Sequence, residues 1–389
     1  MIVHIGPDEK FIDMAHRDFE AVAPGRNLFV IPDRPRPLKH LKTTPARFLT
    51  NRDLIDLIRS DACEAICLHT ISYSVGALRH LPKDKNILWI GWGYDYYELL
   101  LSKAFGYPNG VLGPRTAELM RTQPRPPGAS ANERFRSIAR KLLLRDSPLD
   151  PKYLGAIRYF CPVVETEHEL ACRLNPWFRP HYVDWNYGIL ADELIPMGAS
   201  KPQTGDSILI GNSATETNNH LEVFETIAKT PLLAGRRLLV PLSYGDTDTW
   251  YRDQIIAAGR EMFGDRFVPL VDFMPKAEYT RLLADCGHVF MGHIRQQGFG
   301  NILMMMLMGA KIYMRPESPL YQWLVRKGVS ISTIPADEQG ILDPQALRPL
   351  TDAQWSANRA LIETDFSTTA VLRKTRGVVD TLLGPAGDH

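Results

Sequence analysis

Short apolar runs alternate with amphipathic stretches along the first half of the chain. Helix-like spacing of apolar residues occurs at 11–22 and 51–60. The apolar runs lie at 1–5, 27–31, 65–68, 87–92 and 159–164. Strands that are apolar on both faces and alternate with helices predict a parallel sheet covered by helices. We therefore expect one α/β domain over residues 1–197.

The same alternation resumes in the second half. Predicted strands lie at 207–210, 237–241, 267–270, 288–291 and 311–314, and predicted helices at 218–229, 249–261, 278–285 and 301–308. Residues 198–206 are small and polar, which is typical of an interdomain linker. A second α/β domain is expected at 207–389, with a helical tail, 352–383, that packs back on the first domain.

Residues 286–316 read as strand, glycine loop, buried helix and strand. A loop that opens a helix at the carboxyl end of a strand offers free N–H groups and a positive dipole to a phosphate. An alternative is an ordinary turn with a solvated Arg295; the three long polar side chains before the glycines favour the phosphate site. The candidate binding residues are Arg295, Gln296, Gln297, Gly298, Gly300 and Asn301.

Composition excludes several classes of protein. Across 389 residues, 44% are hydrophobic and 23% charged, which is typical of a globular protein of two domains. A net charge of +1 argues against a nucleic-acid partner. The five cysteines are odd in number and lie mostly in apolar runs, which predicts reduced thiols and no zinc site. With no signal-like N-terminus and no apolar run of spanning length, we expect a cytoplasmic location.

A basic segment, about residues 111–150, interrupts the first half. Its helix-like part, 132–144, places Phe135, Ile138 and Leu142 on one face with arginines beside them. Such a helix suits an anionic membrane surface. The alternative is a helix that packs on its own domain with a solvated basic face.

Several spaced motifs carry a resemblance to a known family. In the second half they are Ile208 to Ser213 with Asn219 and His220, Val240-Pro241 with Tyr244, Arg295 to Gly300, and Arg315 to Pro319 with Gln322. In the first half they are His69, Trp92-Gly93, Asp95 and Tyr97 to Leu99. Together they resemble bacterial family 56 glycosyltransferases. This family is typified by an enzyme that moves 4-acetamido-4,6-dideoxygalactose (Fuc4NAc) from its dTDP carrier to the lipid intermediate of enterobacterial common antigen.

This resemblance implies a GT-B fold, with two Rossmann-like domains facing a cleft. It implies a dTDP-sugar donor in the second domain, held by Gly211, Asn212, Ser213 and Tyr244 besides the glycine loop. The implied acceptor is a saccharide carried on a polyprenyl diphosphate lipid and bound by the first domain. The enzyme would then be a peripheral protein at the cytoplasmic face of the bacterial inner membrane.

One acidic residue of related retaining GT-B enzymes is missing. The helix after the glycine loop carries methionines at 304–306 where those enzymes carry a carboxylate. Glu317 is then the candidate for the ribose hydroxyls, since a carboxylate accepts from both. Its alternative role is to cap the helix that follows Pro316.

Sugar transfer requires stabilisation of the departing diphosphate, which backbone donors and Arg295 supply. No metal-binding carboxylate motif stands out, so neither a metal nor another cofactor is expected. Asp95 is the first candidate for the base that deprotonates the acceptor, and His69 the second. Asp95 is equally suited to capping the helix near Tyr97.

Two other functions share these features. A nucleotide-sugar epimerase of the same fold would use the same diphosphate site without an acceptor. A non-catalytic nucleotide-sugar-binding protein would bind dTDP and transfer nothing.

Overall fold

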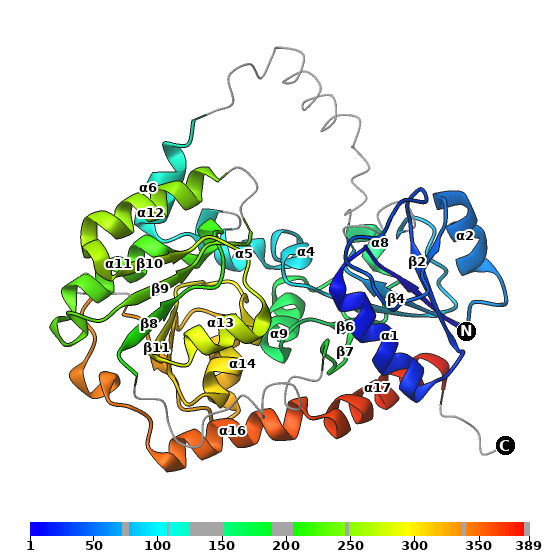
Figure 1. Ribbon diagram of the computed structural model, residues 1–389. Helices are drawn as coiled ribbons and strands as arrows, with labels where there is room; N and C mark the ends of the chain where they lie inside the picture. Colours follow the sequence, from blue (N-terminus) through cyan, green and yellow to red (C-terminus); the bar gives the residue numbers. More distant parts are fainter. Residues whose placement is uncertain are drawn as a thin grey trace. The chain divides into compact units, whose positions relative to one another are not determined.

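The chain folds into two compact units, each built on a parallel sheet (Figure 1). The computed structural model describes residues 1–71, 78–106, 109–124, 151–188, 205–245, 249–335 and 340–384. The first unit combines residues 1–104, 124–188 and 369–389, and the second combines 105–123 and 189–368. The predicted pair of parallel α/β domains is confirmed.

The sheet of the first unit has the order β3-β2-β1-β4-β5-β6-β7. Its strands are β1 (Ile2–Ile5), β2 (Asn27–Ile31), β3 (Arg47–Phe48), β4 (Ala65–His69), β5 (Asn86–Ile90), β6 (Tyr159–Cys161) and β7 (His181–Tyr182). Every residue of β1 and β4 is buried, as expected for central strands covered on both faces.

The helices of the first unit include one from the end of the chain. They are α1 (Lys10–Val22), α2 (Asn51–Arg59), α4 (Tyr94–Tyr96) continued by a π-helical turn (Tyr97–Leu101), α5 (Ser102–Phe105), α8 (Pro151–Leu154), α9 (Glu165–Leu174) and α17 (Thr368–Leu383). Val378 and Leu382 of α17 share a core with Ile12 and Phe19 of α1. Trp185 Nε1 also donates to Thr375 Oγ1 at 2.9 Å.

The sheet of the second unit has the order β10-β9-β8-β11-β12-β13. Its strands are β8 (Ser207–Ile210), β9 (Leu238–Pro241), β10 (Phe267–Leu270), β11 (Cys286–Met291), β12 (Lys311–Met314) and β13 (Ser332–Thr333). Its α-helices are α6 (Pro114–Arg121), α11 (His220–Lys229), α12 (Trp250–Phe263), α13 (Lys276–Leu283), α14 (Phe299–Leu307), α15 (Pro319–Arg326) and α16 (Asp352–Phe366).

Helix α6 belongs to the second unit, although its sequence lies within the first half of the chain. Thr116 Oγ1 donates to Glu222 Oε2 of α11 at 2.6 Å, and Arg115 Nη2 donates to Glu225 Oε1 at 2.8 Å. Leu119 and Met120 pack against the core. Arg115 is therefore engaged within the protein, whereas the predicted basic helix at 132–144 and most of the predicted linker lie outside the described residues.

The chain differs from the predicted elements mainly where strands are short. The two-residue strands β3, β7 and β13 lack the apolar runs by which strands were predicted. The tail predicted as one helical region is two helices, α16 and α17, because Ser367 adopts an extended conformation between them. Within the described residues, no helix has the length and apolar character required to cross a membrane.

Candidate functional site

The order of the second sheet reverses between β8 and β11, which are neighbours. Ligands of open parallel sheets bind outside the carboxyl ends of the strands at such a reversal. Two loops leave these strand ends, residues 211–219 after β8 and residues 292–298 after β11. They contain most of the predicted binding residues.

The loop after β8 is braced by Asn218. Gly211 has a φ of +66°, and a Cβ on it would stand 2.8 Å from Asn218 Oδ1, so a larger residue does not fit. Asn218 Oδ1 accepts from the Asn212 N–H at 3.1 Å, and Asn218 Nδ2 donates to Ser213 O at 3.1 Å. The predicted residues Gly211, Asn212 and Ser213 thus form one fixed turn.

Gln297 joins this turn to the second loop. Its Nε2 donates to Asn212 Oδ1 at 3.2 Å and to Ser213 Oγ at 3.1 Å, and its Oε1 accepts from Thr217 Oγ1 at 2.7 Å. Gln297 is buried. Its position in the sequence predicts contact with a phosphate, but its amide is engaged in holding the two loops together.

Arg295 is different, because its side chain makes no hydrogen bond or ion pair with any described residue. It is half-buried, and its Nε has neither solvent contact nor a partner. Withdrawing a guanidinium from water without a partner is unfavourable, so unpaired half-buried arginines are typical of anion sites. No carboxylate competes for Arg295 within the described residues.

Helix α14 begins beside Arg295. Its N-cap, Gly298, has a φ of +66°, a conformation that favours glycine. The first N–H groups of a helix have no partner within the helix, and its N-terminus favours negative charge. Apart from its chain neighbours and the backbone of its own helix, no atom lies within 4 Å of the Cβ position of Gly300, so space is open at this first turn, which also contains Asn301. The remaining residues of α14, 302–307, are buried, which anchors the helix.

Two histidines near the same strand ends were not predicted as site residues. His293 is fully buried, and neither of its ring nitrogens has a hydrogen-bond partner. His220 Nδ1 lies 3.0 Å from Tyr251 Oη, whereas its Nε2 has no partner. Burial lowers the pKa of both histidines to about 3, so both are neutral at pH 7. His220 stands in one of the motifs that carry the family resemblance, but the burial of both side chains depends on the fold, and no local sequence pattern predicts it.

Glu317 pairs with Arg315 rather than capping a helix. Arg315 Nη2 donates to Glu317 Oε1 at 2.7 Å, while the N-cap of α15 is Ser318. Burial opposes ionisation of Glu317, but the hydrogen bond from Arg315 lowers its pKa overall. The carboxylate keeps a partly exposed edge. Gln296, the remaining predicted residue of the glycine loop, is buried.

Two exposed aromatic rings follow β9 and β10, which are adjacent strands. Tyr244 is 77% exposed and Phe273 is 90% exposed, although large apolar rings are usually covered. The Ala214 N–H donates to Tyr244 O at 2.7 Å, which ties the Tyr244 loop to the loop after β8. Tyr244 was predicted from the sequence and Phe273 was not. Both offer a flat face to a planar ligand.

In the first unit, Asp95 braces the ends of two strands. Its carboxylate accepts from Trp89 Nε1 at 2.9 Å, from the Trp92 N–H at 2.8 Å and from the Ile71 N–H at 3.3 Å. Burial raises the pKa of Asp95, although these donors favour the ionised form. Asp95 lies within the first turn of α4, whose N-cap is Gly93. The predicted base is therefore fully engaged in internal hydrogen bonds.

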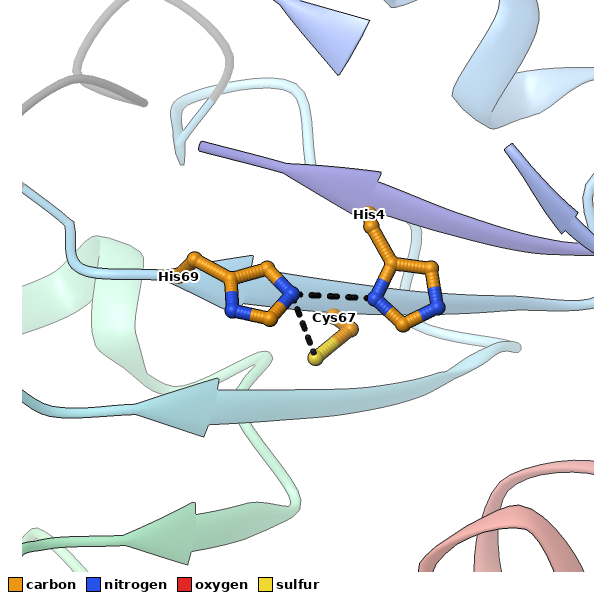
Figure 2. A group of neighbouring side chains, drawn as sticks. All are labelled: His4, Cys67 and His69. Atoms are coloured by element: carbon orange, nitrogen blue, oxygen red, sulfur yellow. Dashed lines mark hydrogen bonds between the residues drawn. The ribbon is translucent and has the colours of Figure 1, made fainter. Parts of the chain in front are cut away.

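The second predicted base, His69, is fully buried within a chain of hydrogen bonds. The Asn27 amide nitrogen donates to two oxygens, so its Oδ1 receives the proton of His4 Nε2 at 3.2 Å. His4 Nδ1 then accepts from His69 Nε2 at 2.9 Å (Figure 2). His69 Nδ1 accepts from Tyr187 Oη at 2.6 Å. Burial lowers the pKa of His69 well below its usual value. Both nitrogens of His69 are engaged.

His4, Cys67 and His69 also place three potential metal ligands within 4.8 Å of one another (Figure 2). The 2.9 Å between the histidine nitrogens is shorter than the roughly 3.3 Å expected of two nitrogens bound to a tetrahedral zinc ion. Burial also raises the pKa of the Cys67 thiol well above its usual value, whereas a metal requires the thiolate. The cluster fits a neutral, hydrogen-bonded core.

Comparisons with known proteins agree with this geometry. The model of a family described as 4-alpha-L-fucosyltransferase, glycosyl transferase group 56, matches residues 190–349. HepE of Anabaena, solved with UDP and glucose, is 11% identical with a TM-score of 0.59, and the match covers 98% of this chain and 99% of HepE. Sucrose-phosphate synthase of Thermosynechococcus elongatus is 12% identical with a TM-score of 0.61, and the match covers 99% of both chains.

A UDP-forming trehalose-phosphate synthase of Burkholderia xenovorans is 10% identical with a TM-score of 0.60, and the match covers 100% of this chain and 99% of the synthase. At these identities the likeness shows the fold, which is GT-B. The family match confirms the resemblance carried by the motifs of the second half. Residues 190–349 thus match the model of glycosyltransferase group 56, which supports a glycosyltransferase function for a chain of GT-B fold.

Proposed function

We propose that this glycosyltransferase transfers a dideoxy amino sugar from a dTDP-sugar to a lipid-linked saccharide in bacterial surface polysaccharide synthesis. The observation that carries the proposal is the unpaired side chain of Arg295, three residues before Gly298, the N-cap of α14, whose first turn has open space at Gly300. Structures of the similar HepE contain UDP and UDP-glucose, which supports a nucleotide-sugar donor. The choice of dTDP and of the sugar rests on the family 56 resemblance.

The proposed chemistry needs placement and charge stabilisation. Transfer leaves negative charge on the departing diphosphate, and Arg295 with the first N–H groups of α14 offsets it. Gln297 keeps Asn212 and Ser213 in place beside this charge. Because these donors are fixed before the reaction, we expect no metal requirement, so activity should persist in EDTA. Loss in EDTA with recovery in magnesium would contradict this.

The proposed acceptor is a saccharide on a polyprenyl diphosphate, which places the enzyme at the cytoplasmic face of the inner membrane as a peripheral protein. The buried hydrogen bonds of Asp95 and His69 favour supporting roles in the first unit over direct contact with the acceptor. Transfer to a lipid-linked acceptor, compared with transfer to the same saccharide without lipid, tests this part of the proposal.

The decisive experiment measures dTDP binding by Arg295→Gln. A charge-assisted hydrogen bond contributes about 1.5–3 kcal/mol, so binding should weaken roughly 10- to 100-fold. Arg260→Gln is the matched control, because Arg260 is exposed on α12 and has no partner among the described residues. Calorimetry and ligand-induced thermal stabilisation should agree. If Arg295→Gln and the parent bind dTDP equally, Arg295 does not bind the diphosphate.

The same preparations separate the alternative functions. An epimerase would convert the nucleotide sugar when no acceptor is present. A non-catalytic binding protein would be stabilised by dTDP and would transfer nothing to any acceptor. A transferase should release dTDP only when the acceptor is added.

A further inference from the structure

An irregular connection joins two adjacent strands of the first sheet. β2 ends at Ile31 and β3 begins at Arg47, and the two strands are parallel. Parallel strands are usually joined through a helix, but residues 32–46 contain none. The connection leaves the carboxyl end of β2, at the edge of the sheet where parallel α/β domains carry their binding loops. We refer to residues 33–47 as the basic loop.

Two aspartates fix the backbone of the basic loop. Asp8 accepts from three successive N–H groups, those of residues 39, 40 and 41, at 2.7–3.0 Å. Asp13 accepts from the next three, those of residues 42, 43 and 44, at 2.7–3.1 Å. Leu41 and Thr44 are buried beneath the loop. Six consecutive N–H groups therefore donate to the two carboxylates, and the side chains of residues 39, 40, 42 and 43 are exposed.

The outward side chains are mostly cations. The basic loop contains five lysines and arginines against one acid, Asp33. The side chains of Arg34, Lys39 and Arg47 are exposed and make no hydrogen bond or ion pair with a described residue. Arg36 pairs with Asp33 and Asp8, and Lys42 Nζ donates to Lys39 O. A chain with a net charge of +1 has thus concentrated unpaired positive charge on one rigid loop.

The spacing of the exposed cations on the basic loop indicates what kind of anion they bind. The unpaired cations project from a continuous exposed loop, and the carboxylates beneath it are saturated by N–H groups. A single phosphate is normally bound by donors that converge on it. Separate cations along an exposed loop, with prolines at 35 and 37 between them, suit an extended anionic surface.

We propose that the basic loop is the surface of the first unit that binds anionic phospholipid headgroups. The inference rests on the proposed function only in that a lipid-linked acceptor requires contact with a membrane. The contact itself does not require donor binding or transfer. It is separate from the basic sequence at 125–150, which lies outside the described residues.

The test is sedimentation of the full chain with vesicles of phosphatidylcholine, alone or mixed with phosphatidylglycerol. Binding should require phosphatidylglycerol and should fall as salt rises, because exposed charges are screened. Each basic residue near an anionic surface changes partitioning roughly five-fold at low salt. The triple variant Arg34→Gln, Lys39→Gln, Arg47→Gln should therefore bind up to about 100-fold more weakly.

The matched control neutralises three exposed cations of the same unit, Arg173, Arg373 and Arg376, which likewise have no partner among the described residues. This control should bind as the parent does. The double variant Arg34→Lys, Arg47→Lys keeps the charge and should also bind as the parent. If the triple variant and the parent bind equally, or if all three variants weaken equally, the basic loop is not the lipid surface.

A competition experiment distinguishes lipid from free phosphate. Sodium phosphate at millimolar concentration should displace the protein from vesicles no better than sodium chloride of equal ionic strength. If phosphate displaces the protein specifically, the basic loop is a discrete phosphate site and not a lipid-binding surface. Failure of the proposed function looks different: dTDP would neither bind nor be released on transfer, while vesicle binding would be unchanged.

Discussion

Asp95 illustrates how the surroundings of one residue decide its role. Its carboxylate accepts three N–H groups from the ends of β4 and β5. In Asp95→Asn, one oxygen becomes an N–H₂ group that faces those donors. A buried donor without an acceptor costs about 1–3 kcal/mol, so we expect the free energy of unfolding to fall by about that amount. Urea unfolding measures this change.

The outcome separates two roles of Asp95. From the sequence alone, Asp95→Asn is expected to reduce turnover far more than stability, because a base would be lost. The hydrogen bonds predict that stability falls as well. If Asp95→Asn has the same free energy of unfolding as the parent and a turnover reduced 100-fold or more, Asp95 acts as the base.

Phe273 yields a second prediction at this scale. Its ring is exposed beside the strand ends that carry the site, and stacking of a base on an aromatic ring contributes about 1–3 kcal/mol. Phe273→Ala should weaken dTDP binding accordingly and leave inhibition by pyrophosphate unchanged. Leu232→Ala, which removes another exposed apolar side chain of the same unit, should bind dTDP normally. Equal loss of dTDP and pyrophosphate binding would mean that Phe273 supports the loop.

The sequence predicted those site residues whose role depends on local chemistry. Arg295 and Gly298 stand out because a strand, a glycine loop and a helix follow one another directly. The engagement of Gln297 and the burial of His293 were not predictable, since both depend on residues distant in the sequence, such as Asn212 and His220. Local patterns do not report which polar atoms another segment will satisfy.

At the scale of elements, hydrogen bonds to the carboxylates of Asp8 and Asp13 hold the backbone of the basic loop. Burial opposes ionisation of Asp8, but the N–H groups of Lys39, Leu41 and His40 lower its pKa to about 2. A carboxylate with a lowered pKa stabilises the fold above its unfolded pKa of about 3.9, and this contribution is lost as the pH falls toward 2.

Asp8→Asn should therefore reduce the free energy of unfolding by about 2 kcal/mol at neutral pH. The difference from the parent should be constant between pH 6 and 8 and should shrink between about pH 4 and pH 2. Thermal unfolding of both proteins across this range measures it. A difference that persists unchanged at pH 2 would show that shape, rather than charge, holds the loop.

Strands were predicted best where their residues are buried on both faces. The runs that became β1, β8 and β11 are mostly apolar and every one of their residues is buried, as central strands of parallel sheets require. β3 was not predicted because Arg47 and Phe48 do not belong to an apolar run. They form a strand at the edge of the sheet because they pair with β2. Edge pairing is decided by tertiary contacts, so it leaves little trace in the sequence.

At the scale of the whole molecule, the two units share the chain unevenly. The chain enters the second unit for residues 105–123, returns to the first, and ends in the first with α17. Val378, Val379 and Leu382 of α17 are core residues of the first unit. A single domain boundary in the sequence therefore does not define which residues belong to each unit.

Removal of residues 368–389 should destabilise the first unit. The loss exposes apolar surface around Phe19 and leaves Trp185 Nε1 without its acceptor. Calorimetry should show an early transition of the first unit, while dTDP should still stabilise the second unit. A control that ends at residue 384 keeps α17 and should unfold as the parent does. Parental unfolding of the shorter protein would show that α17 is dispensable.

The position of α17 also has a consequence for biosynthesis. Domains usually fold in the order in which the ribosome releases them, N-terminal first. Here the first unit takes α17 from a stretch that follows the whole of the second unit, so its core stays incomplete until α17 has been made. The second unit has all its residues by Thr368 and can complete its fold earlier. A nascent chain of this protein therefore exposes apolar core residues of the first unit throughout the synthesis of the second, and chaperones bind such surfaces.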